Sequence, residues 1–381
     1  MRASRGLKAA ALLLAGSLGL AACGDPSLNR NGYKVAQEME DLEAIKPVDI
    51  RKLIWPDKDY LGLAYDSTIT SGMERAQKFG ERADKPHNLL KYFEEFGATF
   101  NTAENTKLWE EGFLPFVDVE PMDGTLKEFA AGHFDNELRS YALQVKKANI
   151  PLAYSFGHEM NGWWYPWGYC SKKGKETNSG EAKTGENLGR ACVGKSEDNK
   201  PEDFVAAWQH VHDIFVDMGV GNVIWVWSPN TAKADDIPPL EEFYPGDQYV
   251  DWIGVSGYMN EDTDPNSPLF KRNDKAFSEV FSDLFTELKT FTKKPIIVAE
   301  TGSTATIRKQ WDIVSMIKAS AKRQDLLGYV WFNIEKEEFG KKIDFRLDAR
   351  PDSLKMYRNI FNSPKWDAKF GFDPKQLTND D

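Results

Sequence analysis

Short apolar segments alternate with amphipathic segments of helical length along most of this 381-residue chain, from Tyr60 to about Phe361. Such an alternation is typical of βα units, in which helices cover a parallel sheet. The eight strands that we expect are Tyr60–Tyr65, Ala98–Thr102, Phe113–Val119, Pro151–Phe156, Asn222–Trp227, Trp252–Ser256, Pro295–Ala299 and Gly328–Phe332. Helical periodicity between them predicts helices at Asn88–Phe96, Asp135–Ala148, Pro201–Met218, Phe277–Phe291, Ile307–Arg323 and Ser353–Phe361.

Eight strands with crossover helices favour a (β/α)8 barrel, the TIM barrel of the α/β class, over a doubly wound sheet. None of the expected strands is followed by Gly-x-Gly-x-x-Gly or by a P-loop. Since those motifs hold the phosphates of nucleotides, their absence from the sequence argues against a nucleotide-binding fold.

Residues 1–22 have the features of a secretory signal peptide. Three basic residues precede the apolar run Ala9–Ala22 of 14 residues, which is shorter than the roughly 18 residues that a membrane-spanning helix needs. The run ends in Leu20-Ala21-Ala22-Cys23, which resembles the lipobox of bacterial lipoproteins. The resemblance implies that Cys23 becomes a lipidated N-terminus, which anchors the protein to a membrane outside the cytoplasm, at the cell surface or in the periplasm.

The rest of the chain divides into three parts. Residues 23–58 are expected to form a polar tether and an N-terminal helical segment, because apolar residues have helical spacing from Tyr33 to Lys46. Residues 59–365 would form one barrel domain, followed by a C-terminal tail at 366–381. We find no internal repeat and no linker between domains within the barrel.

The chain is acidic, with 48 Lys and Arg residues against 59 Asp and Glu residues and a net charge of −11. Because residues 1–22 contain basic but no acidic side chains, their removal leaves the mature protein still more acidic. Such a surface disfavours nucleic acid and anionic polymers as partners. A neutral substrate and a monomeric protein are expected.

Two cysteines remain after Cys23, and they are Cys170 and Cys192. In an exported protein such a pair favours a disulfide, which would stabilise a loop of about twenty residues by roughly 3 kcal/mol. Two free thiols remain the alternative. No histidine or third cysteine accompanies the pair, so we expect neither a metal nor another cofactor.

The segment Ser155–Gly168 has the sequence SFGHEMNGWWYPWG, in which an acidic residue is followed by three tryptophans and a tyrosine. It follows an expected strand, which puts Glu159 at the carboxyl end of that strand. A carboxylate beside flat apolar surfaces suits a sugar, whose C–H faces stack on rings while its hydroxyls need polar partners. The His-Glu-x-x-His motif of zinc proteases fails, because position 162 is glycine.

A second glutamate, Glu300, follows the expected strand Pro295–Ala299. Strands four and seven lie across a barrel mouth from one another, so Glu159 and Glu300 would face each other. Hydrolysis of a glycosidic bond needs two such carboxyl groups, one on either side of the bond. The alternative for each glutamate is a structural carboxylate in an ion pair. Other polar or aromatic residues at strand ends are Glu120, Asn230, Tyr258 and Trp331.

Five segments, in order along the chain, resemble the conserved segments of glycoside hydrolase family 26, best known for β-mannanases. They are His158-Glu159-Met160-Asn161-Gly162 with Trp164-Tyr165-Pro166-Trp167, Val226-Trp227-Ser228-Pro229-Asn230, Asp251 to Tyr258, Ala299-Glu300-Thr301-Gly302, and Trp331-Phe332-Asn333. The resemblance extends over about Tyr60 to Phe361.

The resemblance implies a retaining double displacement in which Glu159 is the general acid/base and Glu300 the nucleophile. It further implies that Tyr258 donates a hydrogen bond to Glu300. The residues expected to bind substrate are His158, Asn161, Trp164, Trp167, Tyr258 and Trp331, with Trp331 as a floor beneath the sugar and Trp164 as a wall beside it.

The sequence departs from the mannanase pattern at Ser155, in Trp164-Tyr165-Pro166-Trp167 and in Val119-Glu120-Pro121, and the first departure removes a charge. Ser155 stands where mannanases of the family commonly have an arginine, four residues before the acid/base. A lysine or arginine elsewhere would have to replace that partner of a carboxylate. The expected substrate is therefore β-1,4-mannan, with mixed-linkage β-1,3-1,4-glucan and β-1,3-xylan as alternatives within the family. A surface lipoprotein that binds glycans without hydrolysing them is the alternative of another class.

Overall fold

The computed structural model of the protein describes residues 45–162, 164–169, 199–231, 237–260, 275–305, 309–320, 323–338, 341–367 and 369–378. Eight parallel strands close into a barrel in which each strand pairs with the next in chain order and β8 pairs with β1. The strands are β1 (Tyr60–Ala64), β2 (Leu89–Glu95), β3 (Leu114–Glu120), β4 (Leu152–Phe156), β5 (Val223–Trp227), β6 (Trp252–Asn260), β7 (Ile296–Ser303) and β8 (Leu326–Phe332). The expected (β/α)8 fold is confirmed.

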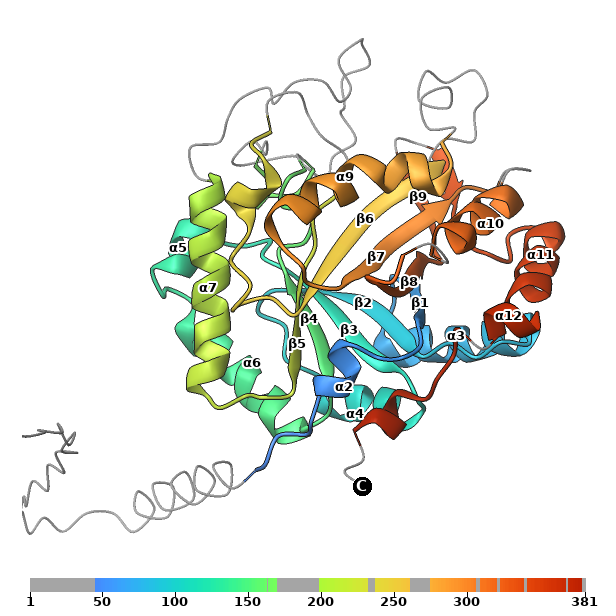
Figure 1. Cartoon of the computed structure of the whole chain (residues 1–381). Coiled ribbons are helices and arrows are strands. Elements are labelled where there is room, and N and C mark those ends of the chain that lie inside the picture. Colours follow the sequence, from blue (N-terminus) through green and yellow to red (C-terminus); the bar gives the residue numbers. More distant parts are fainter. Residues whose placement is uncertain are drawn as a thin grey trace, which may run out of the picture. The chain divides into compact units, whose positions relative to one another are not determined.

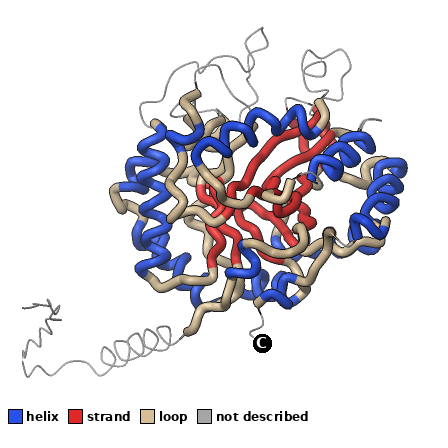
Figure 2. The backbone as a smooth tube through the Cα atoms, in the orientation of Figure 1, coloured by secondary structure: helices blue, strands red, loops and turns tan. Residues whose placement is uncertain are grey.

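Helices surround the strands (Figures 1 and 2). They are α2 (Arg51–Ile54), α3 (Ile69–Ala83), α4 (Thr102–Glu110), α5 (Leu126–Ala130), α6 (Asp135–Ala148), α7 (Pro201–Asp217), α9 (Phe277–Phe291), α10 (Lys309–Ser320), α11 (Pro351–Phe361) and α12 (Pro364–Asp367), with 3-10 turns η1 (Leu240–Phe243) and η2 (Pro374–Leu377). A hairpin of β9 (Glu335–Glu338) and β10 (Lys341–Asp344) follows β8. None of the helices in these ranges is long and apolar enough to cross a membrane.

Local sequence explains where several helices begin. The Thr68 hydroxyl accepts a hydrogen bond from the Ser71 amide at the start of α3, and Thr125 and Glu128 form a capping box on α5. Pro201 occupies the first turn of α7, where its missing N–H leaves no bond unmade. The predicted helices within residues 135–148, 201–218, 277–291, 307–323 and 353–361 are found, and α9 has the predicted bounds.

The second strand was predicted wrongly. Residues 89–95 form β2 rather than a helix, and residues 98–102 precede or begin α4 rather than forming a strand. Both faces of a strand in this barrel are covered, so β2 lacks the alternation of a half-exposed strand and its apolar residues imitate helical spacing. Leu89 faces the barrel interior, whereas Leu90 and Tyr92 pack with the helices.

Aromatic rings and α2 close the amino-terminal end of the barrel. The Tyr60 hydroxyl donates to the Leu53 carbonyl at 2.9 Å, and the Trp252 indole donates to the Ile54 carbonyl at 2.9 Å. The rings of Tyr60 and Trp252 lie 5.3 Å apart between centroids. Each buried ring of this kind contributes about 1.5–3 kcal/mol of hydrophobic stabilisation. Chemistry is therefore confined to the opposite end, where the strands end.

Closure of the barrel between β8 and β1 depends on Gly328, whose φ is +140° and whose Cβ, if present, would lie 2.1 Å from the Tyr60 carbonyl oxygen. We expect Gly328→Ala to lower the free energy of unfolding by about 3 kcal/mol or more. The strain of a positive φ at a residue with a side chain and the clash of its Cβ with Tyr60 both contribute to this loss. Urea titration of the purified variant measures the loss.

Gly97 supplies the matched control, since its φ is +93° and a Cβ there would meet no atom within 4 Å. Gly97→Ala should cost only about 1–2 kcal/mol, from backbone strain alone. Equal losses for the two variants would contradict the close approach at Gly328.

Candidate active site

The acidic residue of the tryptophan-rich segment lies on a strained turn after β4. Glu159 has φ +55°, a left-handed conformation that is rare for residues other than glycine. Its amide donates to the Ser228 carbonyl at 2.6 Å and its carbonyl accepts from the Gly162 amide at 2.8 Å. Strain of this kind costs on the order of 1–3 kcal/mol and persists only where neighbouring contacts enforce it, as it does at many functional sites.

Two donors hold the Glu159 carboxyl group, which is 5% exposed. The Trp164 indole donates to Oε2 at 2.6 Å and the Asn230 side chain donates to Oε1 at 2.7 Å. The Asn161 side chain fixes the backbone of Asn230 in turn. Its Nδ2 donates to the Asn230 backbone carbonyl and its Oδ1 accepts from the Asn230 backbone N–H, both at 2.8 Å. Asn161 thus acts on the site through Asn230.

The second glutamate is held from two other strands. Glu300, in β7, accepts a short hydrogen bond from the Tyr258 hydroxyl of β6 at Oε1. Its Oε2 accepts from the ammonium of Lys91, in β2, at 3.2 Å. Lys91 has no exposed surface, and Glu300 is 7% exposed. Donors on both oxygens favour the ionised carboxylate.

A further carboxylate continues this network around the barrel. Asp118, in β3, is fully buried and lies 2.6 Å from the Lys91 ammonium. His158 approaches Asp118 with Nδ1 at 3.5 Å and the Tyr165 hydroxyl with Nε2 at 3.1 Å. Strands β2, β3, β4 and β7 are thereby joined through polar side chains.

Burial sets the two glutamates apart in protonation. Burial, and then the neighbouring charge of Glu300, raise the pKa of Glu159 to about 7, although the hydrogen bonds from Asn230 and Trp164 oppose the shift. Burial lowers the pKa of His158, so its imidazole is neutral at pH 7. Glu159 is therefore suited to donate a proton and Glu300 to attack as an anion.

A third acidic group lies beside this pair. Glu120 ends β3 and has Oε1 4.0 Å from Nε2 of His158. Burial and the charges of Asp118 and Glu300 raise its pKa to about 8. Glu120 is therefore largely protonated at pH 7 and adds a second neutral carboxyl group to the mouth.

Two predicted aromatic contacts of the sugar are not available. Trp331 is 2% exposed, belongs to the layer between strands and helices, and donates to the Phe345 carbonyl at 2.8 Å. Side chains of successive residues in β8 point alternately to the helices and to the barrel interior, so it is Phe332 that lies in the interior. Trp167 is also 2% exposed and stacks on Tyr165 with centroids 4.4 Å apart. Both tryptophans support the site rather than offering a face to substrate.

Of the other predicted site residues, Glu159, Glu300, Tyr258, Trp164 and His158 come together at the mouth, and Asn161 lies behind them. Cys23, Cys170 and Cys192 lie outside the described residues, so lipidation and disulfide pairing stay predictions. No group of His, Cys, Asp and Glu side chains in the described ranges could hold a metal ion.

The sequence did not single out Lys91 or Asp118. Lys91 was assigned to a helix, where a lysine is ordinary, and Asp118 stands within the apolar strand Leu114–Glu120. The available signal for both residues was a charge inside an otherwise apolar run. Such a charge is rarely buried without a partner, so it indicates an ion pair inside the barrel.

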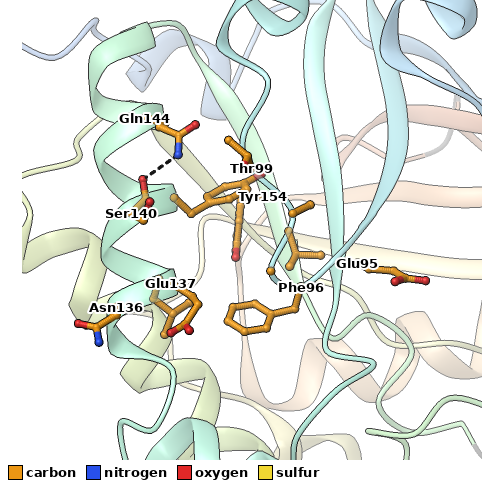
Figure 3. Close-up of a pocket in the computed structure, with 13 residues that line it drawn as sticks. Glu95, Phe96, Thr99, Asn136, Glu137, Ser140, Gln144 and Tyr154 are labelled. Atoms are coloured by element: carbon orange, nitrogen blue, oxygen red, sulfur yellow. Dashed lines mark hydrogen bonds between the residues drawn. The ribbon is translucent and has the colours of Figure 1, made fainter.

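The cavity shown in Figure 3 has a volume of about 240 Å³ and lies between the segment 95–99 and α6. Figure 3 shows Glu137, Ser140 and Gln144 of the helix facing Phe96 and Thr99. Neither Glu159 nor Glu300 lines it. The candidate active site therefore rests on the hydrogen-bonded groups in the barrel mouth.

Comparison with known proteins agrees with this geometry. Residues 134–320 match the model of glycosyl hydrolase family 26. Endoglucanase H of Acetivibrio thermocellus is 25% identical over 289 residues, which are 74% of this chain and 28% of that protein. A mannan endo-1,4-beta-mannosidase of Bacillus subtilis is 26% identical over 176 residues, which are 46% of this chain and 37% of that protein.

Among solved structures, the catalytic domain of an endo-beta-1,4-mannanase from Bacillus sp. JAMB-750 has a TM-score of 0.55 at 14% identity, covering 84% of this chain and 89% of that one. This likeness concerns the fold. The chain spans less than two fifths of the length of the two curated relatives described above.

The barrel, the paired carboxyl groups and the matches are those that a glycoside hydrolase would have. Within that class, the similarity over residues 134–320 is to glycosyl hydrolase family 26.

The opposed states of the two glutamates can be measured without substrate. In protein labelled with 13C at glutamate carboxyl carbons, Glu159 should titrate near its pKa of about 7, and Glu159→Gln, which removes the resonance, assigns it. Glu300→Gln should lower the midpoint, because the Glu300 charge disfavours ionisation of Glu159.

Trp164→Phe should move the same midpoint upward, since it removes a donor that favours the ionised form. A Glu159 resonance that titrates at the ordinary value of 4.5 would contradict the assignment of the acid.

Proposed function

We propose that the protein is a retaining endo-β-glycanase that hydrolyses β-1,4-mannan. The observation that carries the proposal is the pairing, in one barrel mouth, of a buried glutamate with a raised pKa and a second glutamate held by two donors. This pair matches the acid and the nucleophile of a double displacement.

In the first step, Glu300 attacks the anomeric carbon while Glu159 gives its proton to the glycosidic oxygen that leaves. The Glu159 carboxylate that results keeps its hydrogen bonds from Trp164 and Asn230, which are stronger to an ion than to a neutral acid. In the second step, Glu159 takes a proton from water while the water oxygen attacks the anomeric carbon. The bond from that carbon to the Glu300 oxygen breaks, and Glu300 leaves as a carboxylate. Two inversions retain the β configuration.

The proposed substrate rests on charge and on relatives. An anionic sugar would make ionisation of Glu120 and Glu159 still less favourable, and the nearby cation Lys91 already has two carboxylate partners, so the mouth favours a neutral sugar. Two relatives from Bacillus subtilis are named mannan endo-1,4-beta-mannosidases. The name of Endoglucanase H, the relative that matches most of this chain, supports mixed-linkage β-glucan as the second candidate.

A substrate panel tests the proposal. The protein is incubated with galactomannan, glucomannan, barley β-glucan, β-1,3-xylan and xylan, and reducing ends and product sizes are followed. We expect internal cleavage of the mannans, and no activity from Glu300→Ala. Faster cleavage of barley β-glucan would favour the second candidate. Binding without release of reducing ends would leave a glycan-binding protein.

Azide distinguishes the roles of the two glutamates. With an activated aryl glycoside, Glu159→Ala should be rescued by azide and give a β-glycosyl azide, because the nucleophile remains. Its activity on polysaccharide should fall by about 10²- to 10⁴-fold. Glu300→Ala should give no β-glycosyl azide. The reverse pattern would exchange the two roles.

We further propose that Cys23 carries lipid and anchors the protein outside the cytoplasm, on the basis of the Leu20-Ala21-Ala22-Cys23 segment. In a bacterial host, the full chain should fractionate with membranes and take up labelled fatty acid. Cys23→Ala should remove the label, and a labelled variant would rule out Cys23 as the acceptor. Cys192→Ala serves as the matched control.

A further inference from the structure

Lys91 is a fully buried ammonium group that touches the proposed nucleophile. It extends from β2, where it pairs with Ala64 of β1 and Phe116 of β3. Its Nζ lies 2.6 Å from Asp118 Oδ2, 3.2 Å from Glu300 Oε2 and 3.2 Å from the Ala299 carbonyl oxygen. The ammonium thus donates hydrogen bonds to Glu300 and to the Ala299 carbonyl and forms an ion pair with Asp118.

The ammonium remains charged in this environment. Burial by itself would lower the pKa of Lys91, but the carboxylates of Asp118 and then Glu300 outweigh that effect and raise it. The rings of Phe93 and Phe116 lie 5.2 and 5.1 Å from Nζ, measured to their centroids. Water has no access to the ammonium, so its interaction with Glu300 is weakly screened.

Ser155 contributes no such charge. It lies opposite Asp118 in the β3–β4 register and is fully buried, with its hydroxyl 3.3 Å from that of Ser228. The cation that faces the carboxylates therefore comes from β2 rather than from β4.

We propose that the buried Lys91–Asp118 ion pair favours the ionised form of Glu300 before and after the glycosyl ester exists, and holds its side chain in place through both steps of the reaction. Lys91 is then a positioning residue that acts through Glu300, and Asp118 is the partner that holds it. The inference rests on the proposed glycanase function.

Asp118 has a separate task in this arrangement. When Glu300 becomes a glycosyl ester it loses its negative charge, and Lys91 loses one of its two carboxylate partners. Asp118 remains 2.6 Å from the ammonium and keeps its charge compensated. Without such a partner, a buried cation would cost several kcal/mol. In the second step, the same ammonium stabilises the carboxylate that leaves.

Three variants separate this role from a structural one. Lys91→Met/Asp118→Asn removes both charges of the pair with little change of volume. Asp118→Asn removes only the anion and leaves Lys91 to act on Glu300. Lys85→Met makes the same substitution at another buried lysine, which contacts the exposed Asp367 carboxylate at 2.6 Å and the Phe370 carbonyl.

We expect the double variant to lose about 10²- to 10³-fold in kcat, with KM little changed, because a fixed charge at the reacting group is gone. The acidic limb of its profile of kcat/KM against pH should move upward by about one unit or more, since a cation no longer favours the Glu300 anion. Asp118→Asn should move that limb downward, and Lys85→Met should lose stability but keep kcat and the limb.

Titratable side chains from the neighbouring strands also face Lys91, Asp118 and Glu300. The pH titrations of the variants follow their ionisation as well. These side chains are Glu120 of β3, His158, Glu159 and Tyr165 after β4, and Tyr258 of β6.

Carboxyl 13C titration gives the same answer without substrate. The Glu300 resonance, assigned with Glu300→Gln, should protonate at higher pH in the double variant and at lower pH in Asp118→Asn. Absence of these opposite shifts would overturn the inference even in an active enzyme.

A wild-type protein that cleaves nothing in the substrate panel would refute the proposed function, while the shifts of the Glu300 titration would still decide the role of Lys91. If the double variant fails to fold, the Asp118→Asn variant tests the inference alone, through the downward shift of the pH at which Glu300 titrates.

Discussion

The contact between the Lys91 ammonium and the Glu300 carboxylate is the interaction on which the barrel mouth depends. Each group alone would be a buried charge, at a cost of several kcal/mol. Together, and with Asp118 at 2.6 Å, they join strands that are far apart in sequence. An apolar pair could fill the same volume, but it could not provide an anion beside an acid with a raised pKa.

The acid side of the site is built differently. Glu159 stands on a left-handed turn, and its position is enforced by the Ser228 carbonyl, Trp164 and the Asn161–Asn230 pair. These contacts join the loop after β4 to the end of β5. The site thus combines a salt-bridged half and a hydrogen-bonded half, and the nearby charge of Glu300 helps to raise the pKa of Glu159.

Much of this could be predicted from the sequence, for identifiable reasons. The helices after β3, β4, β6 and β8 have clear amphipathic periods. Glu159 follows the apolar strand β4, and Glu300 follows the apolar run Ile296–Ala299 within β7. Prediction failed at β2, because a strand covered on both faces has no alternation to detect. It also failed at Trp331, where a shift of one residue along β8 decides which ring faces the barrel interior.

The sequence by itself determined the class of fold, the two acidic residues and their aromatic neighbourhood, because these depend on local periodicity and on residues close together in the chain. Only the tertiary structure decided which cation serves Glu300. Lys91 and Glu300 are 209 positions apart, and no local pattern reports which buried charges will meet. Closure of the barrel brings them together, since an unpaired charge inside it would be too costly to keep.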